Sequence, residues 1–325
     1  MTVKRMISYR SVWMGIAIIW IMLYHFDFKS LPGALAYIFF LGYSGVDIFL
    51  FASGIGNYYS YLKDEKPLKF FKRRLVKLAP AYVPIILIWG LYSVAYRNLS
   101  ILGVIGNLLG VQQFVKGGTE FNWYITCILI CYLLTPYLTK FISVHKLAAN
   151  CMLLLLIIVI SVCFTNNESL IIVFTRLPIY VVGMLFAKHE YVNIRKKAVV
   201  LVGGVAAGSV LLSISLLYFS DYLWSYGLYW YPFILITPGI CWMISEVSAL
   251  LEKCFLNKLV SVFNCIGSFT FEVFLIHCLS LYLLENYMAS LRDLWRVILM
   301  ILTVAVAFAY KSLNKFFSKL SKKIM

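Results

Sequence analysis

The sequence predicts an all-α integral membrane protein of about ten transmembrane helices, with both termini in the cytoplasm. Of its 325 residues, 62% are hydrophobic and only 13% are charged, whereas an ordinary soluble domain carries roughly 25% charged residues. Nearly uncharged stretches long enough to cross a bilayer recur along the whole chain. The basic residues gather in the short segments between these stretches, which is typical of multi-pass membrane proteins.

The apolar stretches give ten candidate spans in chain order: 11–27, 34–61, 76–96, 121–142, 147–165, 169–188, 198–219, 227–251, 265–288 and 297–317. Each can cross a hydrocarbon core of about 30 Å at about 1.5 Å per residue, although the first and fifth are short. Residues 99–115 are apolar but interrupted by three glycines, which favours a re-entrant or interfacial segment. We expect a single transmembrane domain over residues 1–325, without an appended soluble domain.

The distribution of Lys and Arg fixes the expected orientation of these spans. With the N-terminus in the cytoplasm, 23 of the 29 Lys and Arg residues fall on the cytoplasmic side and five on the other, with Arg176 inside a span. Cytoplasmic loops of membrane proteins carry such an excess of positive charge. The alternation therefore supports both the number of spans and a cytoplasmic position for both termini.

The net charge of +16 does not indicate a nucleic-acid partner, because it lies in short loops between apolar spans. In these loops the basic side chains can contact anionic lipid headgroups or the phosphates of a ligand. The eight cysteines lie mostly inside apolar runs and include no CxxC pair. We expect them to be buried apolar side chains, and we expect no metal site.

Ionisable side chains inside a bilayer are costly, so each is a functional candidate. Within the predicted spans we single out seven such residues: His25, Asp47, Arg176, Glu246, Glu272, His277 and Glu285. His25 lies 13 residues after Val12, which places it about 20 Å up the first helix, in the outer third of the membrane. An imidazole there can take a proton from a hydroxyl, or it can simply bond a neighbouring helix. Both interpretations stay open on the residues alone.

Asp47 needs a partner if it is buried, and His25 or Arg176 are the natural ones. It would either orient the histidine, as the third group of a catalytic triad does, or form an ion pair between helices. Arg176 lies seven residues into the sixth span, so it must be paired or line a wet cavity. Glu272 and His277, five residues apart on the ninth span, point to different faces of a helix.

The densest basic stretch is the cytoplasmic loop 62–77, which includes Lys72, Arg73, Arg74 and Lys77. Part of its charge sets the topology or binds anionic lipid. Guanidinium groups clustered at the mouth of a cavity also suit a polyphosphate, such as the nucleotide end of coenzyme A. At the opposite side, Trp123 and Tyr124 open the fourth span, where an aromatic belt is the default explanation.

Six collinear stretches resemble the membrane-bound acyltransferase-3 family of bacterial O-acyltransferases over the whole chain. The N-terminal matches are Met14-Gly-Ile-Ala-Ile with Leu23-Tyr-His25, and Gly45-Val-Asp-Ile-Phe with Ala52-Ser-Gly54. The central matches are Phe71-Lys-Arg-Arg-Leu-Val-Lys77-Leu-Ala-Pro80-Ala-Tyr82, and Trp123-Tyr124 with Tyr132-Leu-Leu-Thr-Pro136. The C-terminal matches are Arg176-Leu-Pro178 with Gly183-Met184, and Ile266-Gly-Ser-Phe-Thr-Phe with Phe274-Leu-Ile-His277.

The resemblance implies transfer of an acyl group, often acetyl, from cytoplasmic acyl-CoA to a hydroxyl of a cell-surface or lipid-linked glycan at the bacterial plasma membrane. Acyl-CoA would be a co-substrate, and no permanently bound cofactor is implied. His25 takes the catalytic role by resemblance, and Arg73 and Arg74 contact the acyl-CoA phosphates. We expect Asp47 to act beside His25. We expect acyl-CoA to be bound also by Lys72, Lys77 and Arg176. We expect the acceptor to be bound by Trp123, Tyr124, Glu272 and His277.

The sequence departs from the family pattern beside the histidine. The family usually has Arg or Lys eleven residues before it and an acidic residue three positions earlier, where this chain has Met14 and Ser11. Arg10 lies one turn too low to replace the missing charge, whereas Arg176 or Lys72 could compensate. Some members also carry a carboxylate after the tryptophan, in the stretch that holds Ile128 and Leu129 here.

Two alternatives to an enzyme therefore stay open. The first is a non-enzymatic binder, flippase or transporter of glycan precursors on the same fold, which the missing charges favour. The second is the membrane sensor half of a larger system. The aromatic residues of the outer segments fit sugar stacking and an interfacial belt equally well; they are Trp123, Tyr222, Trp224, Tyr229 and Trp230.

Overall fold

The computed structural model describes residues 1–26, 28, 30–116, 123–164, 167–254, 256–288 and 290–324. The side chains of 285–286 and 316–324 lie outside the described part, so nothing follows for the candidate Glu285. The regular structure of the described residues is helical, apart from one isolated antiparallel bridge between Thr2 and Asn193. The expected all-α fold class is confirmed for this part of the chain.

The N-terminal half contains these helices: α1 (Val3–Ser8), α2 (Arg10–His25), α3 (Gly33–Phe40), η1 (Leu41–Ser44), α4 (Gly45–Leu62), α5 (Pro67–Arg97), α6 (Ile101–Leu108), α7 (Gln112–Lys116), α8 (Trp123–Val144) and α9 (Leu147–Val162). The C-terminal half contains α10 (Glu168–Phe174), α11 (Leu177–Lys188), η2 (Ile194–Lys197), α12 (Ala198–Tyr218), η3 (Ser220–Tyr222), α13 (Phe233–Leu251), α14 (Asn257–Gly267), α15 (Thr270–Met288) and α16 (Asp293–Ile324).

Within the described ranges, seven helical segments are long and apolar enough to cross a membrane, and eight if α14 and α15, bent by 68° at their junction, form one broken span. Two shorter apolar helices, α2 and α9, coincide with the first and fifth expected spans. The protein is therefore a multi-pass membrane protein. The count of ten and the orientation of the termini remain predictions.

The apolar stretch 99–115 does not form one continuous span. It is divided between the short helices α6 and α7, which meet at Gly110, a glycine with a positive φ of 72°. The left-handed backbone there ends the first helix at no steric cost, because glycine has no Cβ. The expected departure from a full span is confirmed.

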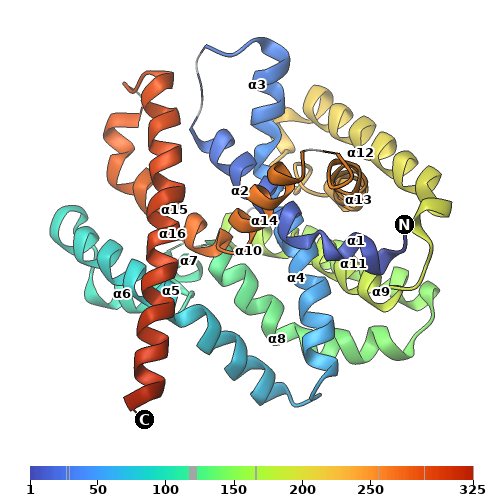
Figure 1. The fold of residues 1–325 in the computed structure, drawn as a ribbon, viewed down its shortest axis with the longest axis horizontal. Helices are drawn as coiled ribbons and strands as arrows, with labels where there is room; N and C mark the ends of the chain where they lie inside the picture. Colours follow the sequence, from blue (N-terminus) through green and yellow to red (C-terminus); the bar gives the residue numbers. More distant parts are fainter. Residues whose placement is uncertain are drawn as a thin grey trace.

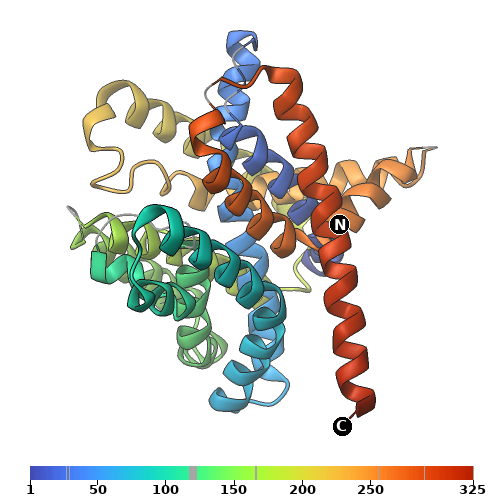
Figure 2. The same cartoon turned by 90° about the vertical axis from the view of Figure 1, so that its left-hand side faces the viewer.

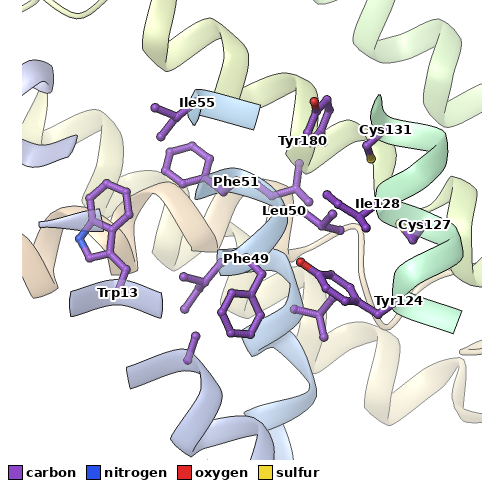
Figure 3. Close-up of a cluster of buried hydrophobic side chains, with 14 of the residues drawn as sticks. Trp13, Phe49, Leu50, Phe51, Ile55, Tyr124, Cys127, Ile128, Cys131 and Tyr180 are labelled. Carbon is purple, nitrogen blue, oxygen red and sulfur yellow. The ribbon is translucent and has the colours of Figure 1, made fainter. Parts of the chain in front are cut away.

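The helices pack around α4, which lies between α2 and α11 near the middle of the molecule (Figure 1). The pair α12 and α13 forms one edge, and the long helix α16 stands with α15 at another (Figures 1 and 2). The large buried side chains near α4 include Trp13, Phe51 and Tyr180, which come from three different helices (Figure 3). This arrangement brings the ends of α2, α4 and α11 together, and those ends carry the ionisable candidates.

Two glycines allow α4 and α11 to approach until their backbones touch. A Cβ on Gly54 would collide with the carbonyl oxygen of Tyr180, and a Cβ on Gly183 would collide with that of Phe51. Without a hydrophobic driving force between helices in lipid, such close packing of small residues is a main source of helix association. The contact also holds the start of α11 against the start of α4.

We expect Gly183→Ala to destabilise the protein by about 1–3 kcal/mol or more, because the added methyl group meets fixed backbone rather than a movable side chain. The melting temperature of the purified protein in a mild detergent measures the loss. Gly203→Ala on α12 is the matched control, since nothing lies within 4 Å of a Cβ there. Equal melting temperatures for the two variants would show that the α4–α11 contact does not need glycine.

The connecting segments fall into two groups that lie at opposite ends of the bundle. In one group, the backbone N–H of Lys4 donates to the carbonyl of Glu190 (2.8 Å), whose carboxylate accepts from Tyr59 (2.8 Å), and Lys188 donates to the carbonyl of Ile142 (2.6 Å). All of these segments are expected in the cytoplasm. This grouping agrees with the alternation of the predicted spans.

The other group joins segments that are expected on the opposite side of the membrane. The backbone N–H of Ser30 donates to the Asp293 carboxylate (2.9 Å), and Arg97 donates to the carbonyl of Tyr282 (3.3 Å). Each end of the bundle is thus stabilised by contacts among its own connecting segments. The bundle therefore has two distinct ends.

Candidate functional site

A cavity of about 640 Å³ opens at the end of the bundle where α2 finishes. We call it the histidine cavity. Its lining includes His25, Tyr43, Trp123, Arg176, Tyr229 and Trp230. Its size lies in the range of small-molecule sites, which are usually apolar with a few convergent polar groups. Two of the predicted intramembrane ionisable residues, His25 and Arg176, therefore face the same space.

His25 is the last residue of α2, and within the described part of the chain its hydrogen-bond contacts all involve Nδ1. Its Nδ1 lies 3.0 Å from the carbonyl oxygen of Ile21 and 3.2 Å from Nε2 of His277. Because a carbonyl oxygen only accepts, the contact with Ile21 assigns the proton of a neutral imidazole to Nδ1. The lone pair of a neutral His25 is then on Nε2, which is the form a general base requires.

His277 lies behind His25 and does not line the histidine cavity. Its side chain is fully buried on α15, and the centroids of the two imidazole rings are 5.1 Å apart. Its Nδ1 has no hydrogen-bond partner among the described residues. The position suits orientation of His25 rather than contact with an acceptor.

Arg296 fixes the backbone immediately after His25. Its guanidinium is 2% exposed and donates to three carbonyl groups, those of Phe26, Leu291 (3.1 Å) and Met288 (2.9 Å). The planar fork of an arginine can bind several acceptors at once without losing its charge. In this way α16 holds the end of α2, and with it the direction of the His25 ring.

Arg176 and Asp47 form a buried ion pair beside the cavity. Nη1 of Arg176 donates to Oδ2 of Asp47, and the two side chains are 3% and 2% exposed. Asp47 lies in the first turn of α4, and Arg176 is the residue that caps the start of α11. The guanidinium also lies over the rings of Trp230 (5.0 Å) and Trp123 (6.0 Å). Asp47 therefore neutralises Arg176, and the structure places His277, not Asp47, against His25.

Aromatic rings make up most of the remaining wall of the histidine cavity. Tyr43 and Tyr229 meet edge to face with centroids 5.5 Å apart, and Trp224 and Trp230 meet in the same way at 5.0 Å. Trp224, Tyr229 and Trp230 line the cavity, whereas Tyr222 does not. An aromatic belt would present these rings to lipid. Trp230, which is 3% exposed, instead faces the cavity that contains His25, whereas Trp224 is 48% exposed and lies at its edge.

A second cavity, of about 420 Å³, lies at the other end of the same bundle. Three cationic side chains line it, Arg10, Arg74 and Lys77, against a single carboxylate from Glu272. We call it the basic cavity. It lies on the side that is expected to face the cytoplasm, since the loop 62–77 leads into it. An excess of cations around a pocket favours an anionic ligand.

Arg74 is directed into the basic cavity by its neighbours on α4, α5 and α8. Its guanidinium lies over the rings of Phe70 (5.1 Å) and Tyr132 (5.8 Å) and donates to the carbonyl of Gly56 (3.4 Å). Its Nε has no partner among the described residues. Gly56 also makes room for Arg10, because a Cβ at this position would lie 2.5 Å from the Arg10 guanidinium.

The other basic residues of the loop lie outside this cavity. Asp64 accepts from Lys69 (2.7 Å) and Arg73 (2.9 Å) at the surface, and the hydrogen bond from Lys69 lowers the pKa of the Asp64 carboxyl. Lys72 is exposed and is not among the residues of the cavity lining. Of the four loop residues expected at a donor site, the structure brings Arg74 and Lys77 into the cavity and leaves Lys72 and Arg73 outside.

The structure also divides the other expected site residues differently from the sequence. Arg176 was expected beside the loop cations, but it lines the histidine cavity. Tyr124 and Glu272 were expected on the acceptor side, but they line the basic cavity. Trp123 lines the histidine cavity as expected. The functional roles of all these residues remain predictions.

Sequence reasoning missed the contribution of Arg10 to the basic cavity. The position of Arg10 one turn below Met14 predicts that it cannot reach His25, and Arg10 is not among the residues that line the histidine cavity. Arg10 and Met14 instead both line the basic cavity. A signal was available, since residues three or four apart on a helix share a face.

The family model for an acyltransferase domain matches residues 13–311, which is most of the chain. Comparisons with curated proteins and with solved structures give no match. The matched range includes His25, Arg74 and Arg176 and most of the residues that line both cavities, whereas Arg10 and Ser11 of the basic cavity precede it. The chain therefore belongs to the acyltransferase-3 family and is a membrane acyltransferase.

Proposed function

We propose that the protein transfers an acyl group, acetyl in the simplest case, from cytoplasmic acyl-CoA to a hydroxyl of a cell-surface or lipid-linked glycan. It would act in the bacterial plasma membrane, with both termini in the cytoplasm. The observation that carries the proposal is the pair of cavities at opposite ends of one bundle. One is cationic, and the other contains a histidine whose Nε2 has no hydrogen-bond partner among the described residues.

The histidine cavity supplies the base for this reaction. Nε2 of His25 takes the proton of the acceptor hydroxyl as its oxygen attacks the thioester carbonyl carbon. The new C–O bond forms, the C–S bond breaks, and the departing thiolate recovers the proton from the imidazolium. His277 and Arg296 hold His25 in position for this step, and no covalent acyl-enzyme is required.

The basic cavity supplies the donor site. Arg10, Arg74 and Lys77 would bind the phosphates of coenzyme A, with charge-assisted hydrogen bonds from the two guanidinium groups. The acyl thioester at the far end of the molecule would then extend toward α15 and the histidine cavity. No bound cofactor takes part in this scheme.

The aromatic wall of the histidine cavity supports a glycan as the acceptor. Sugar rings have apolar faces that stack on Trp and Tyr, and Trp224, Tyr229 and Trp230 present such faces inside the cavity. Arg176 lies among these rings, with its guanidinium carbon 5.0 Å from the centroid of the Trp230 ring and its charge balanced by Asp47. The neutral Asp47–Arg176 pair favours an uncharged or weakly charged acceptor.

Acyl transfer by the purified protein in proteoliposomes tests the proposal. Acetyl-CoA labelled in the acetyl group is supplied with extracts of surface or lipid-linked glycan, and the label is followed into the glycan by mass spectrometry. Labelled glycan esters that require the protein are the expected result. Glycan binding without transfer would contradict the proposal and favour the binder, flippase or transporter.

We expect Arg74→Ala to raise the KM for acyl-CoA at least tenfold, because one charged hydrogen bond to a phosphate contributes about 1.5–3 kcal/mol. The kcat at saturating donor should change much less, since the thioester lies far from the guanidinium. Arg73→Ala is the matched control. It removes the same charge from the neighbouring residue, whose guanidinium pairs with Asp64 at the surface, and it should leave the KM unchanged.

A further inference from the structure

The basic cavity and the histidine cavity share one lining residue among the described residues, Phe274 on α15. The same helix passes along both spaces. Phe271 and Glu272 line the basic cavity before this point, and Cys278 and Leu281 line the histidine cavity after it. Phe274 therefore lies in the partition between the two cavities.

On two other helices, α4 and α8, neighbouring residues also line different cavities. On α4, Val46 lines the histidine cavity and Phe49, one turn later, lines the basic cavity. On α8, the consecutive residues Trp123 and Tyr124 line the histidine cavity and the basic cavity respectively. A helix rises about 4.5 Å over three residues, so the partition is about one layer of side chains thick.

Three aromatic rings fill that layer. The centroids of Tyr124 and Phe274 are 5.1 Å apart, and those of Phe49 and Tyr124 are 6.2 Å apart. Figure 3 shows Phe49 and Tyr124 side by side between α4 and α8. All three side chains are less than 10% exposed, at 5%, 9% and 6% for Phe49, Tyr124 and Phe274. The two cavities are thus separated by side chains and not by backbone.

The partition lies next to the reacting group. His277, which contacts His25 at 3.2 Å, is three residues after Phe274 on α15 and so lies about one turn above it. A thioester that enters from the basic cavity meets the Phe274 ring immediately before it reaches His25. Tyr124 on α8 and Phe49 on α4 line the basic cavity only, whereas Phe274 lines both cavities.

We propose that Phe274 sets the size of the acyl group that this protein transfers, by limiting the opening through which the acyl end of the donor reaches the histidine cavity. The inference rests on the proposed function for its chemistry. The partition itself, however, is a property of the two cavities. No bond forms or breaks at Phe274, which acts as a specificity-determining residue.

The first test compares donors of different length. In Phe274→Ala, the ratio of kcat/KM for butyryl-CoA to that for acetyl-CoA should rise at least tenfold, because the missing ring enlarges the opening. Phe274→Leu should give an intermediate ratio, and it provides a milder variant if the alanine variant folds poorly. Phe271→Ala is the control, since Phe271 lines the basic cavity only, and its ratio should equal that of the unaltered protein. An unchanged ratio in both Phe274 variants would overturn the assignment.

The second test does not depend on acyl transfer. Cys278 lines the histidine cavity and reports on access through the partition once the exposed cysteines 151, 163, 254 and 265 have been changed to serine. A charged, membrane-impermeant thiol reagent is added to inverted vesicles, whose outer surface carries the loop 62–77. Phe274→Ala should label Cys278 at least tenfold faster than the protein with Phe274, and Phe271→Ala should not. The further change Cys278→Ser should remove the added label.

The two tests separate the failure of this inference from the failure of the proposed function. Faster labelling of Cys278 without transfer from any acyl-CoA would uphold the partition and contradict the enzymatic proposal. Transfer with an unchanged donor ratio and unchanged labelling would uphold the enzyme and contradict the role of Phe274.

Discussion

Replacement of His25 by alanine is expected to lower acyl transfer by at least a hundredfold, because a positioned general base contributes about 10²–10⁴ to the rate of such reactions. The loss should appear in kcat at saturating acyl-CoA and glycan. The KM for acyl-CoA should be little changed, because the donor phosphates lie in the other cavity. Initial rates of transfer in proteoliposomes measure both constants.

His145→Ala is the matched control for this variant. His145 lies at the end of α8, stacked on Phe141 with ring centroids 4.1 Å apart, and it lines neither cavity. Its loss should leave the rate unchanged. A His25→Ala protein that inserts in the membrane, melts normally and keeps full activity would exclude the imidazole as the base.

Asp47→Ala is expected to destabilise the protein by about 3–5 kcal/mol, because it leaves the Arg176 guanidinium charged and unpaired inside the bundle. Arg176→Ala should have an effect of the same order for the opposite reason. The melting temperature of the purified protein in a mild detergent should fall in both variants. Activity should be lost with stability, since the pair borders the histidine cavity.

The double variant Asp47→Ala with Arg176→Ala distinguishes an ion pair from two independent contributions. Removal of both charges leaves no unpaired buried charge. The loss of stability in the double variant should therefore be smaller than the sum of the losses in the two single variants. Arg195→Ala provides the surface control, because the Arg195–Glu246 pair (2.7 Å) leaves the arginine 67% exposed. Little change in melting temperature is expected there. Additive losses at Asp47 and Arg176 would show that the two charges do not stabilise one another.

The membrane class and the positions of the apolar helices could be predicted from the sequence because they depend on local hydrophobicity. The family pattern and the depth of His25 in the first span single it out from the sequence, and its catalytic role stays a prediction. The partners of the charged residues could not be predicted in this way. Asp47 had two candidates, and the contact with Arg176 exists because Gly54 and Gly183 bring α4 and α11 together.

The distribution of residues between the two cavities also required the structure. Arg73 and Arg74 are neighbours in sequence, yet only Arg74 turns toward the bundle, where Phe70 and Tyr132 hold it. Trp123 and Tyr124 are likewise neighbours that face different cavities. Consecutive residues of a helix point about 100° apart, so the side each one faces depends on helix rotation, which a sequence without a visible repeat does not determine.

Arg10 changes the significance of the departures from the family pattern. Met14 lacks the charge that the family usually has at this position, and the sequence alone suggested a weakened site. The basic cavity nevertheless contains three cations, because Gly56 leaves space for the Arg10 guanidinium beside Arg74. The missing charge at Met14 therefore does not leave the cavity without cations.

The most direct test of the account is the sidedness of the reaction, because the central claim is that donor and acceptor occupy cavities at opposite ends of the bundle. Inverted membrane vesicles receive acetyl-labelled acetyl-CoA on the outside only, with the acceptor glycan present both inside and outside. We expect the label on glycan that a glycan hydrolase reaches only after detergent is added. Label confined to glycan on the same side as the acetyl-CoA would contradict the arrangement of the two cavities.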